Sequence, residues 1–341
     1  MERCIELALR GAGKVAPNPM VGSVLVYDHM IIGEGYHEQY GGPHAEVNCI
    51  RSVKPEHEHL IALSTLYVSL EPCSHFGKTP PCTNLILEKK IPRVVIGCTD
   101  PFPEVNGRGI RILREAGVEV ESGILEQECK ELNKRFFFNI QHQRPYIILK
   151  WASTLNGKIA SADKPRLMIS NALTNRLVHR WRAEEAAILV GTNTALADDP
   201  SLNVRHWTGK SPVRIVIDRQ LRLPGHLKLF DQSVPTIVLN TIKDEKNDQL
   251  HFVKIKDGND TVSSIVSALQ DLKIQSVLVE GGSALLQSFI NAGFWNEARV
   301  IINETLTVSD GLSAPQLTNA DVVKTAQVGT DRIHYFIRQT S

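Results

Sequence analysis

The sequence lacks a strong charge of either sign, because 38 Lys and Arg residues face 37 Asp and Glu residues and leave a formal net charge of +1. A domain that binds nucleic acid over a large surface carries a clear excess of Lys and Arg, so we expect no nucleic-acid partner. Long apolar runs are also missing, since no stretch approaches the roughly 18 residues that span a bilayer. We therefore expect no membrane partner.

Cysteine is scarce, with six residues in 341, and the segment Met1 to Lys14 has no apolar core. We expect no signal peptide and hence a cytoplasmic location, where thiols stay reduced. The cysteines are then better explained as metal ligands or buried thiols than as disulfides. Cys4, Cys49, Cys98 and Cys129 lie in apolar patterns and are predicted to be core residues.

The sequence does contain enough apolar material for two cores, because hydrophobic residues make up 42% of a chain that is long enough for two domains of ~150 residues. Strands and helices alternate from the start, with a predicted hairpin over 21–33 and a helix over 44–51. A polar and aromatic stretch ends near Gln143, and a second series begins at Tyr146. Its predicted strands cover 146–151, 187–190, 213–217, 236–239 and 276–280, followed by two near 299–303 and 333–337. The pattern predicts an α/β fold with domains over 1–143 and 144–341, the second with a mixed sheet.

Three short segments of the first domain contain residues suited to metal chemistry: Pro43-His44-Ala45-Glu46, Glu71-Pro72-Cys73 and Pro80-Pro81-Cys82. One imidazole and two thiolates suit Zn²⁺. Three protein ligands leave the fourth tetrahedral position open, which is typical of catalytic rather than structural zinc. Glu46 follows His44 by two residues on the same predicted helix, and it can move protons without binding the metal.

The order of these residues, His-x-Glu followed by Pro-Cys and a second Cys, is typical of zinc-dependent base deaminases. The usual spacing Pro-Cys-x-x-Cys is absent, because eight residues, Ser74 to Pro81, separate Cys73 from Cys82. Taken singly, each residue is better explained as a buried histidine or an inert core cysteine. Their joint occurrence with Glu46 favours a zinc deaminase.

Longer motifs resemble one family, the bifunctional deaminase–reductases of riboflavin biosynthesis. The matching stretches are Ala16–Gly22, His44–Glu46, Glu71–Cys82, Asp100–Pro101, Val105–Gly109, Leu149–Ser153, Ala197–Pro200 and Val279–Gly282. The long loop Gly77-Lys78-Thr79-Pro80-Pro81 between the cysteines separates this family from cytidine and tRNA-adenosine deaminases. The resemblance implies a cytidine-deaminase-like N-terminal domain and a dihydrofolate-reductase-like C-terminal domain.

For the first domain, the resemblance implies hydrolytic deamination of 2,5-diamino-6-(ribosylamino)-4(3H)-pyrimidinone 5′-phosphate, with Zn²⁺ held by His44, Cys73 and Cys82. Glu46 would take the proton of the attacking water and deliver it to the departing ammonia. The positions that match substrate contacts are Asn18, His75, Lys78 and Asp100. Lys78 could meet the ribose phosphate or be a solvated loop lysine, and His75 fits better beside the metal ligands than among them.

In the second domain, Gly281-Gly282 follows an apolar strand and opens a helix, where backbone N–H groups can approach a phosphate. Taken alone, this pattern is better explained as an ordinary turn. The resemblance implies that this domain uses NADPH to reduce the ribosyl group to ribityl. The positions that match cofactor contacts are Ala152, Thr194, Asp198, Gly282, Ser283, Ala284, Leu285, Leu286, Gln287 and Ser288. The positions that match substrate contacts are Arg182, Leu202, Arg205 and Glu280.

Three departures from the family pattern keep alternatives open. Phe102 stands where the family often has Asn, and Asn156 stands where it usually has Asp. Met168 stands where the family often has Trp. Asn156 motivates one alternative, a deaminase with a degenerate reductase domain that serves assembly only. A second alternative, an RNA-binding editing protein on a deaminase fold, is disfavoured by the neutral charge. We expect a small-molecule substrate, Zn²⁺ and NADPH as cofactors, and a homo-oligomer.

Overall fold

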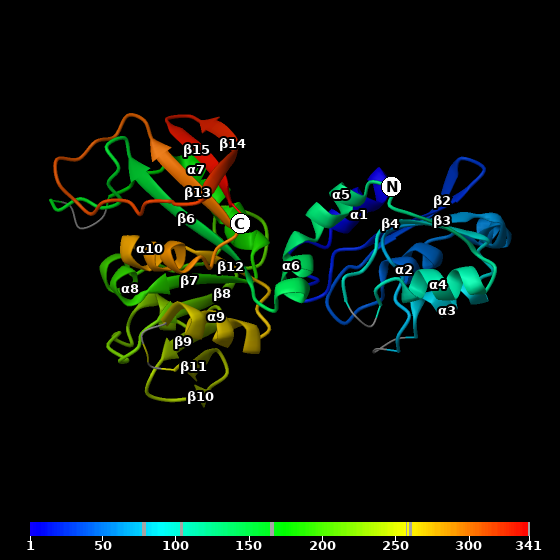
Figure 1. The fold of residues 1–341 in the computed structure, drawn as a ribbon, viewed down its shortest axis with the longest axis horizontal. Coiled ribbons are helices and arrows are strands. Elements are labelled where there is room, and N and C mark those ends of the chain that lie inside the picture. Colours follow the sequence, from blue (N-terminus) through cyan, green and yellow to red (C-terminus); the bar gives the residue numbers. More distant parts are fainter. Residues whose placement is uncertain (77–79, 103–104, 164–166, 257, 259–260, 340–341) are drawn as a thin grey trace. The chain divides into compact units, whose positions relative to one another are not determined.

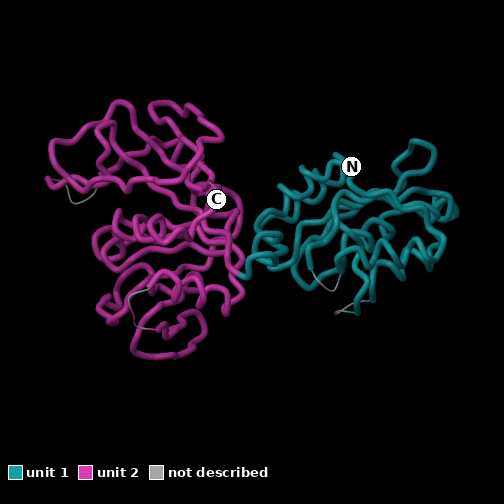
Figure 2. Tube along the Cα trace, in the orientation of Figure 1, with its two compact units in different colours: residues 1–143 teal, residues 144–341 magenta. Residues whose placement is uncertain are grey.

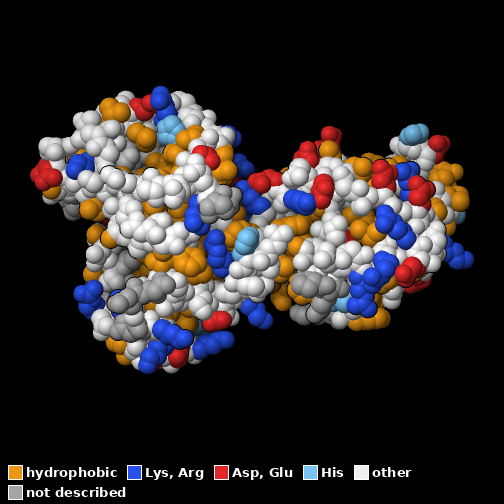
Figure 3. Space-filling model, in the orientation of Figure 1, with side chains coloured by type: hydrophobic (Ala, Val, Ile, Leu, Met, Phe, Trp, Pro, Cys, Tyr) orange, Lys and Arg blue, Asp and Glu red, His pale blue; other side chains and the backbone are white. Residues whose placement is uncertain are grey.

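The computed structural model describes residues 1–76, 80–102, 105–163, 167–256, 258 and 261–339. The chain divides into two compact units, Met1–Gln143 and Arg144–Ser341 (Figures 1 and 2). On the face drawn in Figure 3, basic and acidic side chains are interspersed over each unit. In the described part of the chain, no helix has the length and apolar character needed to cross a membrane.

The first unit is built on a five-stranded sheet with the order β2-β1-β3-β4-β5. The strands are β1 Gly22–Tyr27, β2 Met30–Tyr36, β3 Thr65–Leu70, β4 Arg93–Cys98 and β5 Glu119–Ser122. Strands β3, β4 and β5 are parallel, whereas β1 runs antiparallel to β2 and β3. The predicted hairpin is confirmed. Tyr27 pairs with Met30, and Asp28 and His29 take positive φ angles of 43° and 63°, as tight hairpin turns require.

Helices cover both faces of this sheet (Figure 1). They are α1 Glu2–Leu9, α2 Ala45–Arg51, α3 Cys82–Glu88, α4 Arg108–Glu115, α5 Glu126–Leu132 and α6 Lys134–His142, with a 3₁₀ segment, η1, over Pro55–Leu63. Helices α2, α3 and α4 share one core with the sheet, and α1, α5 and α6 pack on its other face. Cys4, Cys49, Cys98 and Cys129 are buried in these cores, as predicted.

A close approach between β2 and α2 fixes the start of the helix that follows His44, a predicted zinc ligand. A Cβ atom at Gly35 would lie 2.2 Å from the backbone nitrogen of Cys49 and 2.6 Å from the carbonyl of Ala45. Only glycine fits there without moving the helix. The strand therefore holds α2 with His44 as the residue just before its first turn.

The second unit contains a ten-stranded sheet with the order β10-β11-β9-β8-β7-β12-β6-β13-β15-β14. Its strands are β6 Tyr146–Thr154, β7 Ala187–Gly191, β8 Val213–Ile217, β9 Thr236–Asn240, β10 Glu245–Lys246, β11 Leu250–Lys254, β12 Ser276–Val279, β13 Glu297–Asn303, β14 Ala320–Val328 and β15 Asp331–Arg338. The strands from β11 to β13 in this order are parallel, and the sheet ends in antiparallel pairs on both sides. The predicted mixed sheet is confirmed.

The helices of the second unit are α7 Ala172–Glu184, α8 Thr192–Asp198, α9 Thr261–Asp271 and α10 Ser283–Ala292, with a 3₁₀ turn, η2, at Lys228–Phe230. The strands bury side chains on both faces. In β7, Leu189 packs in the core shared with α9 and α10, whereas Ile188 and Val190 face the core that includes Ala195 of α8. Strands covered on both faces read as continuous apolar runs, and such runs are what made β7, β8 and β9 predictable.

Helix α7, which carries Arg182, begins at a side-chain cap. The Oδ1 atom of Asn171 accepts a hydrogen bond from the backbone nitrogen of Thr174 at 3.0 Å, and its Nδ2 atom donates to the carbonyl of Val328 at 2.6 Å. The cap therefore also ties the helix to the end of β14.

We expect Asn171→Ala to lower the free energy of unfolding of the second unit by about 1–3 kcal/mol, because both hydrogen bonds are lost. All four tryptophans lie beyond residue 144, so urea denaturation followed by tryptophan fluorescence reports on this unit. Asn171→Ser keeps a capping oxygen and should lose less. Equal stability of wild-type and Asn171→Ala proteins would show that the cap contributes nothing.

Candidate active sites of the two units

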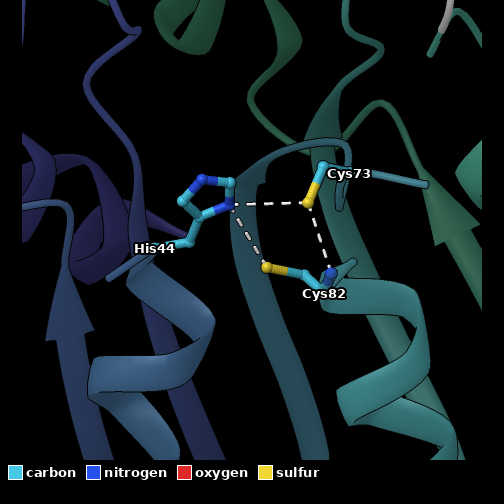
Figure 4. Close-up of side chains that lie close together, drawn as sticks. All are labelled: His44, Cys73 and Cys82. Atoms are coloured by element: carbon cyan, nitrogen blue, oxygen red, sulfur yellow. Dashed lines mark hydrogen bonds between the residues drawn. The ribbon is translucent and has the colours of Figure 1, made fainter. Parts of the chain in front are cut away.

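Three side chains from separate elements of the first unit lie close together, as a metal site would require (Figure 4). His44 precedes α2, Cys73 lies in the loop after β3, and Cys82 is the first residue of α3. The Nδ1 atom of His44 lies 3.5 Å from the sulfur of Cys73 and 3.4 Å from that of Cys82. A tetrahedral zinc with usual Zn–N and Zn–S bonds separates its nitrogen and sulfur ligands by about 3.5 Å. The three residues therefore fit Zn²⁺.

The surroundings of Cys73 favour an anionic sulfur. The backbone N–H of Cys82, at the start of α3, donates to the sulfur of Cys73 at 3.2 Å. Hydrogen bonding from the Cys82 thiol, assisted by His44, lowers the pKa of Cys73 to about 4. The hydrogen bond between the two cysteine side chains, together with burial, raises the pKa of Cys82. The pair therefore loses its first proton easily and keeps the second. Thiolates are the form in which cysteine binds a metal.

Glu46 lies on the first turn of α2, is only 3% exposed and faces the same cavity as His44 and Cys73. Burial raises the pKa of its carboxyl group, and the charge of His44 opposes this shift only in part. A carboxyl group in this position, beside the metal ligands and facing the cavity, can take up and release a proton during a reaction.

A cavity of about 250 Å³ opens beside the ligand cluster. The predicted substrate residues Asn18, His75 and Asp100 line it together with Glu46. Burial raises the pKa of Asp100 to about 6, and its carboxylate accepts a hydrogen bond from the backbone nitrogen of Phe102 at 2.8 Å. The predicted substrate residue Lys78 lies outside the described residues.

His37 is a cavity residue that the sequence analysis missed. Its Nδ1 atom lies 2.9 Å from the carbonyl of Pro43, and its Nε2 atom lies 3.1 Å from Nδ2 of Asn18. Burial lowers the pKa of the imidazole, so the ring is neutral near pH 7. Nδ1 then donates to the carbonyl and Nε2 accepts from the amide, which orients Asn18.

Phe102 also lines the cavity, with its ring centroid 6.3 Å from that of His75. An apolar ring thus occupies a wall position where the family often has an amide. At this point the cavity wall therefore offers an aromatic ring instead of the hydrogen-bonding amide that the family often has.

In the second unit, Arg182 and Glu280 form a bidentate pair, with both nitrogen–oxygen distances at 2.8 Å. Lys150, which the sequence analysis did not include among the site residues, lies 3.7 Å from the same carboxylate. Burial would raise the pKa of Glu280, but the charges of Arg182 and Lys150 outweigh it and lower the pKa to about 2. Arg182 is thus a largely buried partner of Glu280.

The glycine turn after β12 meets α8. The backbone N–H of Gly282 donates to the hydroxyl of Thr194 at 2.9 Å, and α10 begins at the next residue, Ser283. Strands β7, β12 and β6 are adjacent and parallel, so their carboxyl ends meet at one edge of the sheet, where α/β proteins bind ligands. The predicted cofactor residue Ala152 lies near this end of β6.

The remaining predicted residues of this unit differ in accessibility. Asp198 is exposed at the end of α8, and Leu202 is buried with a φ angle of 47°. The backbone nitrogen of Arg205 donates to Nδ1 of His179 at 3.1 Å. On α10, Ala284 is exposed, whereas Ser283, Leu285, Gln287 and Ser288 are half-buried. The side chain of Leu286 packs fully inside the core, so no side-chain contact to a cofactor is available there.

Each unit matches its own family model, and relatives that match over nearly the whole chain belong to one family. Residues 1–98 match the family described as the cytidine and deoxycytidylate deaminase zinc-binding region, and residues 145–327 match the RibD C-terminal domain. The chain is 39% identical to the riboflavin biosynthesis protein RibD of Aquifex aeolicus, over 98% of this chain and 94% of that one. It is 36% identical to RibD of Escherichia coli, over 91% and 88% of the two chains.

Solved structures agree. A diaminohydroxyphosphoribosylaminopyrimidine deaminase/5-amino-6-(5-phosphoribosylamino)uracil reductase from Thermotoga maritima superposes with a TM-score of 0.90 at 37% identity, covering 99% of this chain and 97% of that one. Acinetobacter baumannii RibD superposes with a TM-score of 0.88 at 32% identity, covering 99% and 98%. The predicted fold class, a cytidine-deaminase-like domain followed by a dihydrofolate-reductase-like domain, is confirmed.

We expect Cys82→Ala to lose most of the bound zinc, because His44 and Cys73 alone make a weak site. Metal content measured by atomic emission should fall from about one ion per chain to a small fraction. Cys49→Ala removes an equally buried thiol outside the cluster and serves as the control, with unchanged zinc. Full zinc content and full deaminase activity in Cys82→Ala would contradict the ligand assignment.

Proposed function

Because the chain belongs to the RibD family of riboflavin biosynthesis proteins, we propose that residues 1–143 carry its deaminase and residues 144–341 its reductase. The chain is a bifunctional enzyme of riboflavin biosynthesis that acts on a small-molecule substrate with Zn²⁺ and NADPH. The convergence of His44, Cys73 and Cys82 beside the buried Glu46 is the observation that supports this most strongly. No feature of the described residues favours a reductase domain that serves assembly alone.

The first reaction is hydrolytic deamination of 2,5-diamino-6-(ribosylamino)-4(3H)-pyrimidinone 5′-phosphate. When bound by His44, Cys73 and Cys82, zinc supplies Lewis-acid activation of water near pH 7. Glu46 takes the proton from the attacking water and returns it to the leaving ammonia, a role for which its buried position beside the metal ligands is suited.

The walls of the cavity orient the pyrimidine. Asn18 is held by the neutral His37, so its amide oxygen remains available as an acceptor for a ring N–H or amino group. Asp100 and His75 line the same space and complete the polar contacts. Lys78, at its place in the loop between the cysteines, provides the positive charge for the ribose phosphate.

The second reaction is reduction of the ribosyl group to ribityl, for which NADPH supplies the hydride when bound. The backbone N–H groups at the start of α10, together with Thr194 and Asp198, hold the cofactor near the glycine turn. Arg182 and Arg205 bind the substrate, and Glu280 keeps the guanidinium of Arg182 in place through two hydrogen bonds. We place the enzyme in the cytoplasm and expect it to form a homo-oligomer.

We expect Glu46→Gln to slow deamination by ~10²-fold or more, because the amide cannot carry the proton. Zinc should remain bound, since Glu46 is not a ligand, and reduction of the already deaminated substrate should proceed at the wild-type rate. The two steps are measured separately, by ammonia release with the first substrate and by NADPH absorbance with the second.

Glu56→Gln, the same substitution at an exposed position of η1, is the matched control and should change neither step. If Glu46→Gln abolished both steps in a folded, zinc-loaded protein, the separation into two sites would be wrong.

We expect Gly282→Val to raise the KM for NADPH with deamination unchanged. A side chain there would crowd the hydroxyl of Thr194, since a Cβ atom would already lie 3.3 Å from it, and would obstruct a phosphate at the start of α10. Gly225→Val, at an exposed position with open space around it, is the control. Unchanged reductase kinetics in Gly282→Val would mean that the turn has no part in cofactor binding.

A further inference from the structure

Glu71 is a buried carboxylate with an unusual set of partners. It directly follows β3, precedes the zinc ligand Cys73 by two residues and is 4% exposed. Both oxygens accept hydrogen bonds from backbone nitrogens, without any cation in the set. Oε1 accepts from Gly109 at 2.9 Å and Ile110 at 3.3 Å, and Oε2 accepts from Gly107 at 2.9 Å and Asp100 at 3.3 Å.

These donors lie within residues 100–102 and 105–110, which include three residues that line the cavity. Three of them lie at the start of α4, where backbone N–H groups have no partner within the helix and where a negative charge is favoured. The fourth donor, at Asp100, lies at the entrance to the loop that leads to α4. Asp100, Phe102 and Val105 of this loop line the cavity beside Glu46.

A second contact joins the same two segments. A Cβ atom at Gly109 would lie 2.3 Å from the carbonyl oxygen of Pro72, so the first turn of α4 rests directly on the backbone next to Cys73. Two independent observations, the four hydrogen bonds and this close approach, therefore couple the cavity wall to the metal-ligand loop.

We infer that Glu71 is a positioning residue of the deaminase: it fixes residues 100–102 and 105–110, and with them this part of the substrate-facing wall, relative to Cys73. This inference rests on the proposed assignment of deamination to this cavity. Glu71 itself needs no contact with the reacting atoms, because both of its oxygens are already engaged by backbone donors.

Glu71→Gln tests the inference with almost no change in shape. A glutamine offers one acceptor oxygen, and its NH₂ group would face two backbone donors, so two buried N–H groups lose their partner. We expect the KM for the diaminopyrimidine substrate to rise about tenfold or more, with a smaller fall in kcat. Zinc content and reductase kinetics should stay at wild-type values.

Gly109→Ala perturbs the same junction while Glu71 itself is kept: the added Cβ atom would lie 2.3 Å from the carbonyl oxygen of Pro72 and 3.2 Å from Oε1 of Glu71. The added methyl group must push the start of α4 away from Pro72, so the KM for the same substrate should rise in this variant too. This variant also decides the inference if Glu71→Gln does not fold. Glu34→Gln, at a β2 carboxylate that accepts from Arg3 at 2.6 and 2.9 Å and does not line the cavity, should leave the KM unchanged.

Zinc measurement separates positioning of the wall from support of the metal. A raised KM in zinc-loaded Glu71→Gln and Gly109→Ala, with faster amide hydrogen exchange at Gly107 to Ile110, supports the inference. An unchanged KM in the folded, zinc-loaded variants overturns it, as does a loss of activity explained by zinc loss alone. If the wild-type chain released no ammonia, the proposed function would fail instead. Binding affinity for the same substrate, compared across the variants, would then decide the positioning role.

Discussion

A carboxylate that is buried away from water must find hydrogen-bonding or charged partners inside the protein. The two candidate sites depend on how three glutamates meet this constraint. Glu280 is paired with Arg182 and Lys150, and it stays ionised with a lowered pKa. Glu71 is satisfied by four backbone N–H groups and binds two segments of the chain together. For Glu46, the charge of His44 offsets burial only in part, so its pKa is raised. One side-chain type therefore serves as a fixed charge, a cap and a proton carrier, according to its surroundings.

Parallel strands explain why these residues meet. In the first unit, β3 ends just before Glu71, and β4 ends two residues before Asp100. In the second unit, β12 ends just before Glu280, and the adjacent β7 leads into α8 with Thr194. The carboxyl ends of neighbouring parallel strands share one edge, and the helices that follow present their N-terminal N–H groups at that edge. Both units thus place polar side chains where backbone donors are already concentrated.

The sequence allowed the zinc ligands and the central strands to be predicted, because three rare ligand types and continuous apolar runs are local signals. His37 was missed because its role depends on contacts with Asn18 and Pro43 that only the hairpin fold creates. Lys150 was missed as a site residue because a lysine inside an apolar strand signals nothing until Glu280 is placed beside it. Strand β14 was missed because it is an edge strand whose Val322 and Val323 are both exposed, so it has no alternating pattern. Leu286 was included because it falls within a contiguous motif, although its face of α10 is buried.

Asn156 shows how a departure from a family pattern changes meaning once its contacts are known. Its Oδ1 atom accepts a hydrogen bond from the hydroxyl of Thr154 at 2.8 Å, and its Nδ2 atom donates to the carbonyl of Val308 at 2.7 Å. A carboxylate could make the first contact but would face the second carbonyl as one acceptor against another. The amide therefore fits this turn, and it fastens the residues after β6 to the segment after β13. Since Asn156 has a defined structural role, the loss of charge at this position gives no reason to regard the reductase domain as degenerate.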